Sequence, residues 1–301
     1  MHGVLIVDKP PGLTSHDVVA AARRLLGERR IGHTGTLDPM ATGVLPLAIG
    51  RATRLVRFLS ASDKDYDATI RFGVTTDTYD VTGAETSRTG LTPDIDAVMR
   101  GLDALRGEYL QMPPPYSAKK VQGQRAYDLA RAQRDVTLAS VPVRVSRVEL
   151  ADVSGATARV TLTCSAGFYV RSFAHALGEL TGTGAALEAL RRTRSGDFLL
   201  QEAVGLDALD AGRGASRVLP LEALLRDMPA VTLTPLGRQH VAHGRELARQ
   251  DFLTPDPLPL LPAPRPATTE WTRLLDAEGA LVGVATAGTS PDSLHPALVL
   301  I

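Results

Sequence analysis

The sequence predicts an α+β fold, a mixed α/β architecture in which a central antiparallel-rich sheet is flanked by helices. Strand-like runs such as 4–7 and 158–164 are mixed with helix-like periods, and no strand–helix unit repeats as it would in a doubly wound sheet. Beyond about residue 225 the chain changes to short β-like pieces joined by Gly and Pro. We therefore predict a large domain at 1–225 and a small β domain at 226–301.

The elements of the large domain follow from local signals. Thr14 or Ser15 can cap a helix whose apolar residues keep helical spacing until Gly27. Thr92-Pro93 is a strong helix start, because Pro fits the first helical position. The expected strands are 4–7, 44–49, 66–73, 141–148 and 158–164; the expected helices are 14–27, 51–59, 92–107, 169–180 and 185–192; the expected irregular segments are 32–43, 75–90 and 112–120.

The small domain is expected to be a β domain built of short pieces. Its β-like pieces are 231–233, 271–275, 281–285 and 297–301. A segment at about 254–267 is so rich in proline that we expect a stiff insertion or linker.

Composition limits the class of protein. Hydrophobic residues make up 44% and charged residues 22% of the 301 positions, as in ordinary globular proteins. The single cysteine, Cys164, excludes an intrachain disulfide framework and a Cys-based zinc site. No run approaches the roughly 20 apolar residues of a membrane span, and the chain starts on a strand-like segment instead of a signal peptide. We expect a cytoplasmic protein without membrane contact.

The net charge of zero hides two basic stretches. Between Lys9 and Arg57 there are eight Lys or Arg against three acids, and between Pro113 and Glu149 seven against three. If both stretches lie on one face, that face suits a polyanion such as RNA. Scattered solvated arginines remain the alternative.

Several patterns give no site. His240 and His243 have no third metal ligand nearby, and Asp77 and Asp80 are expected in a solvated loop. No phosphate-binding glycine motif follows a strand, so neither a nucleotide cofactor nor a metal is expected.

The stretch 32–45 is the strongest candidate for chemistry. It combines glycines, threonines, a proline and one acid, Asp38, directly before an apolar strand. Such a loop lets backbone approach a ligand closely. An ordinary Asp-Pro turn accounts for this composition equally well.

Six motifs in fixed order resemble the TruB-type tRNA pseudouridine synthases of bacteria. They are Asp8 to Ser15, the Gly-His-Thr-Gly-Thr-Leu-Asp-Pro-Met-Ala-Thr-Gly loop at 32–43, Lys64 to Ala68, Pro113 to Tyr127, Cys164 to Ser172, and Leu190 to Thr193. The resemblance covers roughly residues 3–200. The end of the chain is similar, more weakly, to a PUA-type RNA-binding domain. Phe168 departs from the pattern, since the family usually has Thr there.

The resemblance implies an isomerase that converts uridine to pseudouridine at position 55 in the T arm of tRNA. The glycosidic N–C bond is exchanged for a C–C bond without cofactor or metal. Asp38 matches the essential aspartate, which either attacks the ribose C1′ or assists formation of a glycal. Arg171 matches an arginine that would favour the ionised carboxylate, and Tyr66 a tyrosine that stacks on the flipped base.

The resemblance also implies residues that bind the RNA. His33 matches a residue that inserts into the T loop, although a loop histidine is on general grounds more often solvated. The further expected substrate contacts are Lys9, Leu190 and Gly32 near the active site, and Lys119, Lys120, Arg191 and Arg192 at phosphates.

Two other functions stay open at this point. The protein could act mainly as a tRNA-folding chaperone, or as the catalytic subunit of a guide-RNA-dependent particle. The absence of a Lys-rich tail argues against the second. We expect a monomer with tRNA as its partner and no obligatory protein partner.

Overall fold

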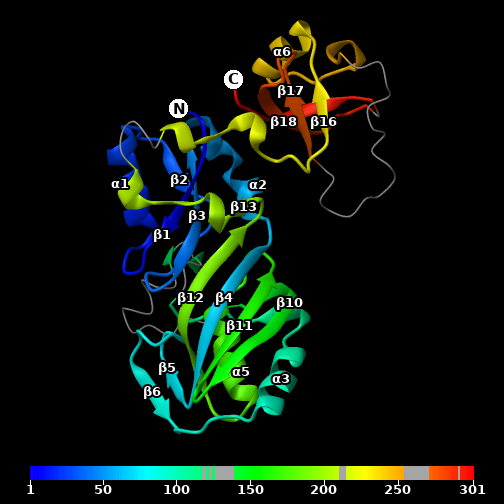
Figure 1. Ribbon diagram of the computed structural model, residues 1–301. Coiled ribbons are helices and arrows are strands. Elements are labelled where there is room, and N and C mark those ends of the chain that lie inside the picture. Colours follow the sequence, from blue (N-terminus) through cyan, green and yellow to red (C-terminus); the bar gives the residue numbers. More distant parts are fainter. Residues whose placement is uncertain (117–119, 122–123, 126–138, 210–214, 254–270, 291) are drawn as a thin grey trace.

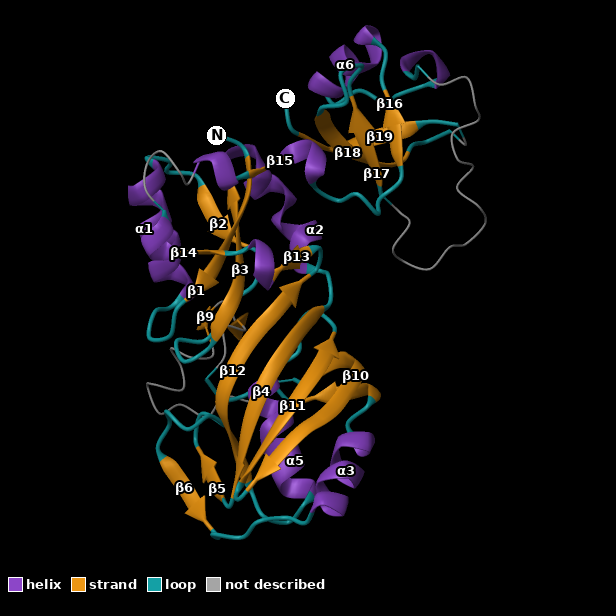
Figure 2. Cartoon of the chain, in the orientation of Figure 1, coloured by secondary structure: helices purple, strands orange, loops and turns teal. Residues whose placement is uncertain are grey.

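The computed structural model of the chain describes residues 1–116, 120–121, 124–125, 139–209, 215–253, 271–290 and 292–301. Figure 1 shows one large sheet through the body of the molecule and a smaller sheet in the C-terminal part, beside the N-terminus. Helices lie beside the large sheet, as Figure 2 shows by colour. The predicted mixed fold with an antiparallel-rich sheet is confirmed.

The large sheet has eleven strands, whose main order is β14-β1-β3-β12-β4-β11-β10-β7. Neighbouring strands are antiparallel except for the parallel pairs β3–β12 and β1–β14. β2 and β13 pair with β3 and β12, and β15 pairs with β1. The bounds are β1 (Gly3–Lys9), β2 (Ile31–His33), β3 (Thr42–Ile49), β4 (Lys64–Phe72), β7 (Gly107–Gln111), β10 (Val141–Ser154), β11 (Thr157–Cys164), β12 (Ala185–Ser195), β13 (Phe198–Leu199), β14 (Val204–Gly205) and β15 (Leu219–Pro220).

The segment expected as a helix at 185–192 is the central strand β12, so that prediction is wrong. Its sequence is rich in Ala, Leu and Arg, which favour helices when no partner is present. In the fold it pairs with β4 from Ala185 to Ser195 and with β3 on its other side. Ladder hydrogen bonds and burial between two strands therefore override the local preference.

The remaining expected elements of the large domain are mostly in place. Thr14 caps α1 in a capping box and Gly27 closes it in the left-handed conformation. The helix expected from residue 92 starts later, with Asp94 as its cap, and the expected loop at 75–90 contains a hairpin. These elements are α1 (Ser15–Leu26), the 3-10 helix η1 (Gly50–Leu55), α2 (Val56–Ser60), α3 (Ile95–Ala104), α5 (Val170–Leu180), and the hairpins β5 (Val74–Thr76) with β6 (Glu85–Arg88) and β8 (Lys120–Val121) with β9 (Gln124–Arg125).

Burial alternates along β4 and divides the two faces of the large sheet. Tyr66, Ala68, Ile70 and Phe72 are buried in the main core, which also takes in residues of α1, α3 and α5. On the other face the strand carries polar residues such as Asp67. Tyr66 therefore belongs to the face on which the helices pack.

The C-terminal part forms a four-stranded sheet, as its β-like pieces predicted. Its order is β16-β17-β18-β19, and α6 packs beside it. A second core joins it to the large sheet: Val4 and Ile6 of β1 cluster with Val284 and Leu300. The division into domains at residue 226 stays a prediction, and the Pro-rich segment at 254–267 lies outside the described residues. The bounds are β16 (Ala230–Thr232), α6 (Pro235–Ala242), β17 (Thr272–Leu275), β18 (Leu281–Ala287) and β19 (Leu294–Val299).

Candidate active site

Asp38 lies in the loop between β2 and β3, and backbone hydrogen bonds shape this loop. The Thr34 N–H donates to the Pro46 carbonyl at 3.1 Å, and the Ala41 N–H donates to the Asp38 carbonyl at 3.1 Å. Gly43 follows with a φ of 100°, and a Cβ there would lie 2.2 Å from the Arg192 carbonyl oxygen. A glycine is therefore required where the loop enters β3 beside β12.

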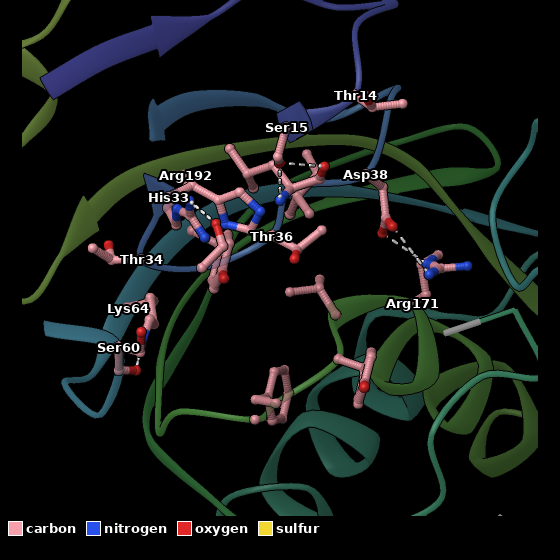
Figure 3. A pocket seen from close by; sticks show the side chains of 18 of the residues that line it. Thr14, Ser15, His33, Thr34, Thr36, Asp38, Ser60, Lys64, Arg171 and Arg192 are labelled. Atoms are coloured by element: carbon pink, nitrogen blue, oxygen red, sulfur yellow. Dashed lines mark hydrogen bonds and ion pairs between the residues drawn. The ribbon is translucent and has the colours of Figure 1, made fainter. Parts of the chain in front are cut away.

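Arg171, in the first turn of α5, meets Asp38 at two points. Its Nε lies 2.9 Å from Oδ2, and an Nη2–H donates to Oδ1 at 3.1 Å (Figure 3). The arginine side chain is 7% exposed and the aspartate side chain 34%. A two-point ion pair fixes orientation as well as charge, so the carboxylate is held in one pose while it still faces solvent.

The other donors of Arg171 are also engaged. Nη1–H donates to the Thr78 carbonyl at 3.0 Å, and Nη2–H to the Tyr116 carbonyl at 2.9 Å. Nη1 lies 3.6 Å from the carboxylate of Asp80, which is 4% exposed and accepts hydrogen bonds from Thr78 and Thr82. The expectation of a solvated Asp80 is wrong, because this acid is buried against Arg171.

Tyr66 and Leu190 form apolar walls beside these charges. Both are 8% exposed, and they come from the neighbouring strands β4 and β12. Burial raises the pKa of the Tyr66 phenol, so the ring is neutral at physiological pH. An aromatic face next to a carboxylate can hold a base while the acid acts on its sugar.

His33 ends β2 at the edge of the same space. Burial, followed by the charges of His16 and Arg192, lowers the pKa of His33 to about 4. The imidazole is therefore uncharged at neutral pH, and its ring packs edge-on against that of His16. An uncharged ring can stack among nucleobases without the desolvation cost of a cation.

These residues share one pocket of about 920 Å³. That volume lies near the upper end of the usual range for ligand sites, roughly 300–1,000 Å³. Figure 3 shows Asp38 and Arg171 on one side, with His33, Arg192 and Lys64 on the other. The described lining carries the cations Lys64, Arg171 and Arg192 against the one carboxylate of Asp38. All three cations are bonded to protein oxygens, so they favour an anionic ligand through the positive potential of the pocket and not through free donors.

Comparison with known proteins places the chain in a family. The model of the N-terminal domain of TruB family pseudouridylate synthases matches residues 23–170, and that of the tRNA pseudouridylate synthase B C-terminal domain matches 171–228. A tRNA pseudouridine synthase B of Solibacter usitatus is 39% identical over 305 residues, which covers both chains completely. The chain belongs to the TruB family of pseudouridylate synthases.

Other relatives agree with this assignment. A tRNA pseudouridine synthase B of Gloeobacter violaceus is 48% identical over 245 residues, covering 78% of this chain and 82% of the relative. Among solved structures, a chain of a Cbf5-Nop10-Gar1 complex superposes with a TM-score of 0.75 at 25% identity, covering all of this chain and 85% of that one. This TruB-family chain thus shares its fold with a protein found in a multi-protein complex.

Lys9 does not line the pocket of this TruB-family chain, although we expected it near the substrate. It is fully buried, and its ammonium donates to the carbonyls of Pro10 at 2.9 Å, Pro39 at 3.2 Å and Ala41 at 2.7 Å. Burial lowers its pKa to about 8. The geometry gives Lys9 the task of holding the loop on the C-terminal side of Asp38.

Two arginines expected at phosphates are engaged with protein. Arg192 is 1% exposed, and its guanidinium donates to the Val44 and Gly35 carbonyls at 2.7 and 3.1 Å. Arg191 pairs with Asp8 at 2.7 Å. Their phosphate contacts stay predictions, but both already shape the site. Gly32 does not line the pocket, Lys119 lies outside the described residues, and of Lys120 only the backbone is described.

The basic stretches separate into paired and unpaired arginines. Arg144 pairs with Asp63 at 3.2 Å and Arg147 with Glu149 at 2.8 Å, on the side of the sheet away from the helices. In the first stretch, the guanidinium groups of Arg24, Arg30 and Arg51 have no described carboxylate within 4.0 Å. Among the arginine side chains that the structure describes in the two stretches, the unpaired ones therefore belong to the first; of the second stretch, only Arg144 and Arg147 are described.

The sequence reasoning missed Asp80, His16 and Lys64. Asp80 stands at the centre of Thr78-Tyr79-Asp80-Val81-Thr82, and threonines on both sides of an acid could have indicated a hydrogen-bonded carboxylate. Lys64 lies inside a motif that carried the resemblance and His16 directly follows another, but spacing alone does not direct them to the pocket. In the described part of the chain, no cluster of three His, Cys, Asp or Glu could hold a metal, and no helix could cross a membrane.

Proposed function

We propose that this chain isomerises a uridine of tRNA to pseudouridine, at position 55 of the T arm. The observation that carries the proposal is the Asp38–Arg171 pair in a pocket with an aromatic wall, on a chain of the TruB family. The curated relatives are named tRNA pseudouridine synthase B, and this supports tRNA as the substrate.

The chemistry needs an ionised carboxylate at the sugar. The N1–C1′ bond of the uridine breaks, the base turns, and C5 bonds to C1′; the proton on C5 then leaves to solvent, and N1 takes up a proton from solvent. Asp38 can attack C1′ or take part in forming a glycal, and both roles suit a carboxylate held by Arg171 and open to the pocket.

Chemistry on a base also requires its removal from the stack, at a cost of about a few kcal/mol. In our proposal the flipped base rests against Tyr66 and Leu190, while the neutral ring of His33 occupies the space left in the RNA. Both walls and His33 line the same pocket, and this arrangement supports the division of tasks.

We further propose that the chain works as a monomer in the cytoplasm, where its substrate is, without an obligatory protein partner. The C-terminal part from residue 226 would serve as a PUA-like RNA-binding domain. Its four-stranded sheet and its packed contact with β1 support a unit held at a fixed place beside the catalytic part.

The test uses purified protein and tRNA transcript labelled with tritium at C5 of uridine, without any guide RNA. Tritium release from one uridine, mapped to the T arm, is expected for the wild type. The Asp38→Asn variant should release none while it still binds tRNA. A wild type that refolds tRNA but leaves all uridines unchanged would support a chaperone instead, and activity only with an added guide would support a particle subunit.

A further inference from the structure

We propose that Ser15 is a positioning residue for Asp38, an inference that rests on the function proposed above. The Ser15 hydroxyl donates to the Leu37 carbonyl at 3.0 Å and accepts the Leu37 N–H at 2.8 Å. The serine is 1% exposed, so water does not compete for these bonds. One hydroxyl thus satisfies both backbone groups of the residue that precedes the catalytic aspartate (Figure 3).

The loop is held differently on the other side of Asp38. There the Lys9 ammonium binds the carbonyls of Pro39 and Ala41, and the Gly12 N–H donates to the Pro39 carbonyl at 2.8 Å. None of these bonds reaches the peptide before Asp38. Ser15 supplies the matching contact on the N-terminal side.

The side chain of Leu37 also anchors the loop, but it fixes the depth of the residue in the core and not the rotation of its backbone. It is 3% exposed and packs in the main core. Apolar packing sets the depth of the residue and is not directional. The two hydrogen bonds of Ser15 set the rotation of the Leu37 backbone, and with it the direction in which the next side chain, Asp38, meets Arg171.

The hydroxyl of Ser15 is not needed to cap α1. That task belongs to Thr14, whose Oγ1 accepts the Asp17 N–H at 3.1 Å, and to Asp17, whose carboxylate accepts the Thr14 N–H at 2.8 Å. The helix cap and the contact with the Asp38 loop are therefore made by different side chains at the N-terminal end of α1. An Asp17→Ala variant weakens the helix start and leaves the Ser15–Leu37 bonds intact, which makes it a matched control.

The experiment measures single-turnover tritium release with enzyme in excess over tRNA, so that an inactive fraction of enzyme does not change the rate constant. Ser15→Ala is expected to lower this constant by about 10- to 100-fold, as small misplacements of reacting groups do. Its affinity for tRNA should not change. Asp17→Ala should keep the wild-type constant. Hydrogen exchange should show the Leu37 amide losing protection in Ser15→Ala only.

Two results overturn the proposal. One is a Ser15→Ala rate constant equal to that of Asp17→Ala. The other is a loss of rate while the Leu37 amide keeps its protection, because the serine would then act by another route. If the wild type itself released no tritium, the proposed function would fail instead, and the exchange measurement would still report whether Ser15 holds Leu37.

Discussion

The Asp80 carboxylate lies 3.6 Å from Nη1 of Arg171, and both side chains are almost completely buried. Arg171 therefore stands between two acids, with Asp38 open to the pocket and Asp80 closed off behind it. Asp80 fixes the orientation of the Arg171 guanidinium, and the guanidinium in turn fixes the orientation of the Asp38 carboxylate. An Arg is suited to this because its planar fork can meet two carboxylates at once.

Replacing Asp80 should therefore reduce turnover although it does not line the pocket. In Asp80→Asn the charge behind Arg171 is lost while the size is kept. We expect a rate constant lower by about 10- to 100-fold, because the guanidinium loses a partner that fixes its pose. Single-turnover tritium release measures this. Asp67→Asn is the control, since Asp67 pairs with Arg159 on the exposed face and such pairs contribute only about 0–1 kcal/mol. Equal rates in both variants would contradict the prediction.

Arg171 itself should not tolerate lysine. Lys keeps the charge but has no fork, so Arg171→Lys cannot hold both oxygens of Asp38 together with the Thr78 and Tyr116 carbonyls. We expect a fall in the rate constant of about 100-fold or more, as for loss of a preorganised charge contact. The measurement is again single-turnover release, with circular dichroism to check the fold. A variant with wild-type turnover would show that charge alone is sufficient.

The sequence predicted the loop around Asp38 and most elements correctly, because these depend on local signals and on motifs with specific order. It failed at β12, where pairing with β3 and β4 outweighs helix preference, and that pairing cannot be seen in a local window. It also missed the strand β7, whose start at Gly107 reads locally as the end of a helix.

In the site, the sequence indicated which residues belong together but not which way they point. Lys9 and Arg192 carry charges typical of phosphate contacts, yet both are buried with their donors on backbone carbonyls. The direction of a side chain depends on the face of the strand or loop that the core takes. Tertiary packing decides which face is buried, through contacts between residues far apart in the sequence, such as the hydrogen bond from Arg192 to the Val44 carbonyl.

His33 should make stability depend on pH in mildly acidic solution. Its pKa is lowered to about 4 in the folded protein, against about 6.5 for a free histidine. Between these values the unfolded state binds a proton that the folded state does not, so stability falls as pH drops from 6.5 towards 4. Urea unfolding at several pH values should show a shallower decline for His33→Gln than for the wild type. Parallel declines would contradict the assignment.

Arg57 should hold the C-terminal sheet against α2. Its guanidinium carbon lies 4.5 Å from the ring centroid of Phe58 and 4.6 Å from that of Trp271, and the two rings pack edge to face. Trp271 is the single tryptophan of the sequence, so its fluorescence reports this contact alone. Arg57→Ala should shift the emission to longer wavelength and increase quenching by acrylamide. Arg51→Ala, at an exposed position of η1, should change neither.

The unpaired arginines should set the salt dependence of tRNA binding. Arg30 is exposed, lies three residues before His33 in the chain, and its guanidinium has no carboxylate partner in the described structure. Arg159 is equally exposed but pairs with Asp67 on the other face of the sheet. Phosphate contacts release counterions, so the slope of log K against log salt should fall by about one for Arg30→Gln. Filter binding at several salt concentrations measures the slope, which Arg159→Gln should leave unchanged. Equal slopes for both variants would mean that the first basic stretch does not face the RNA.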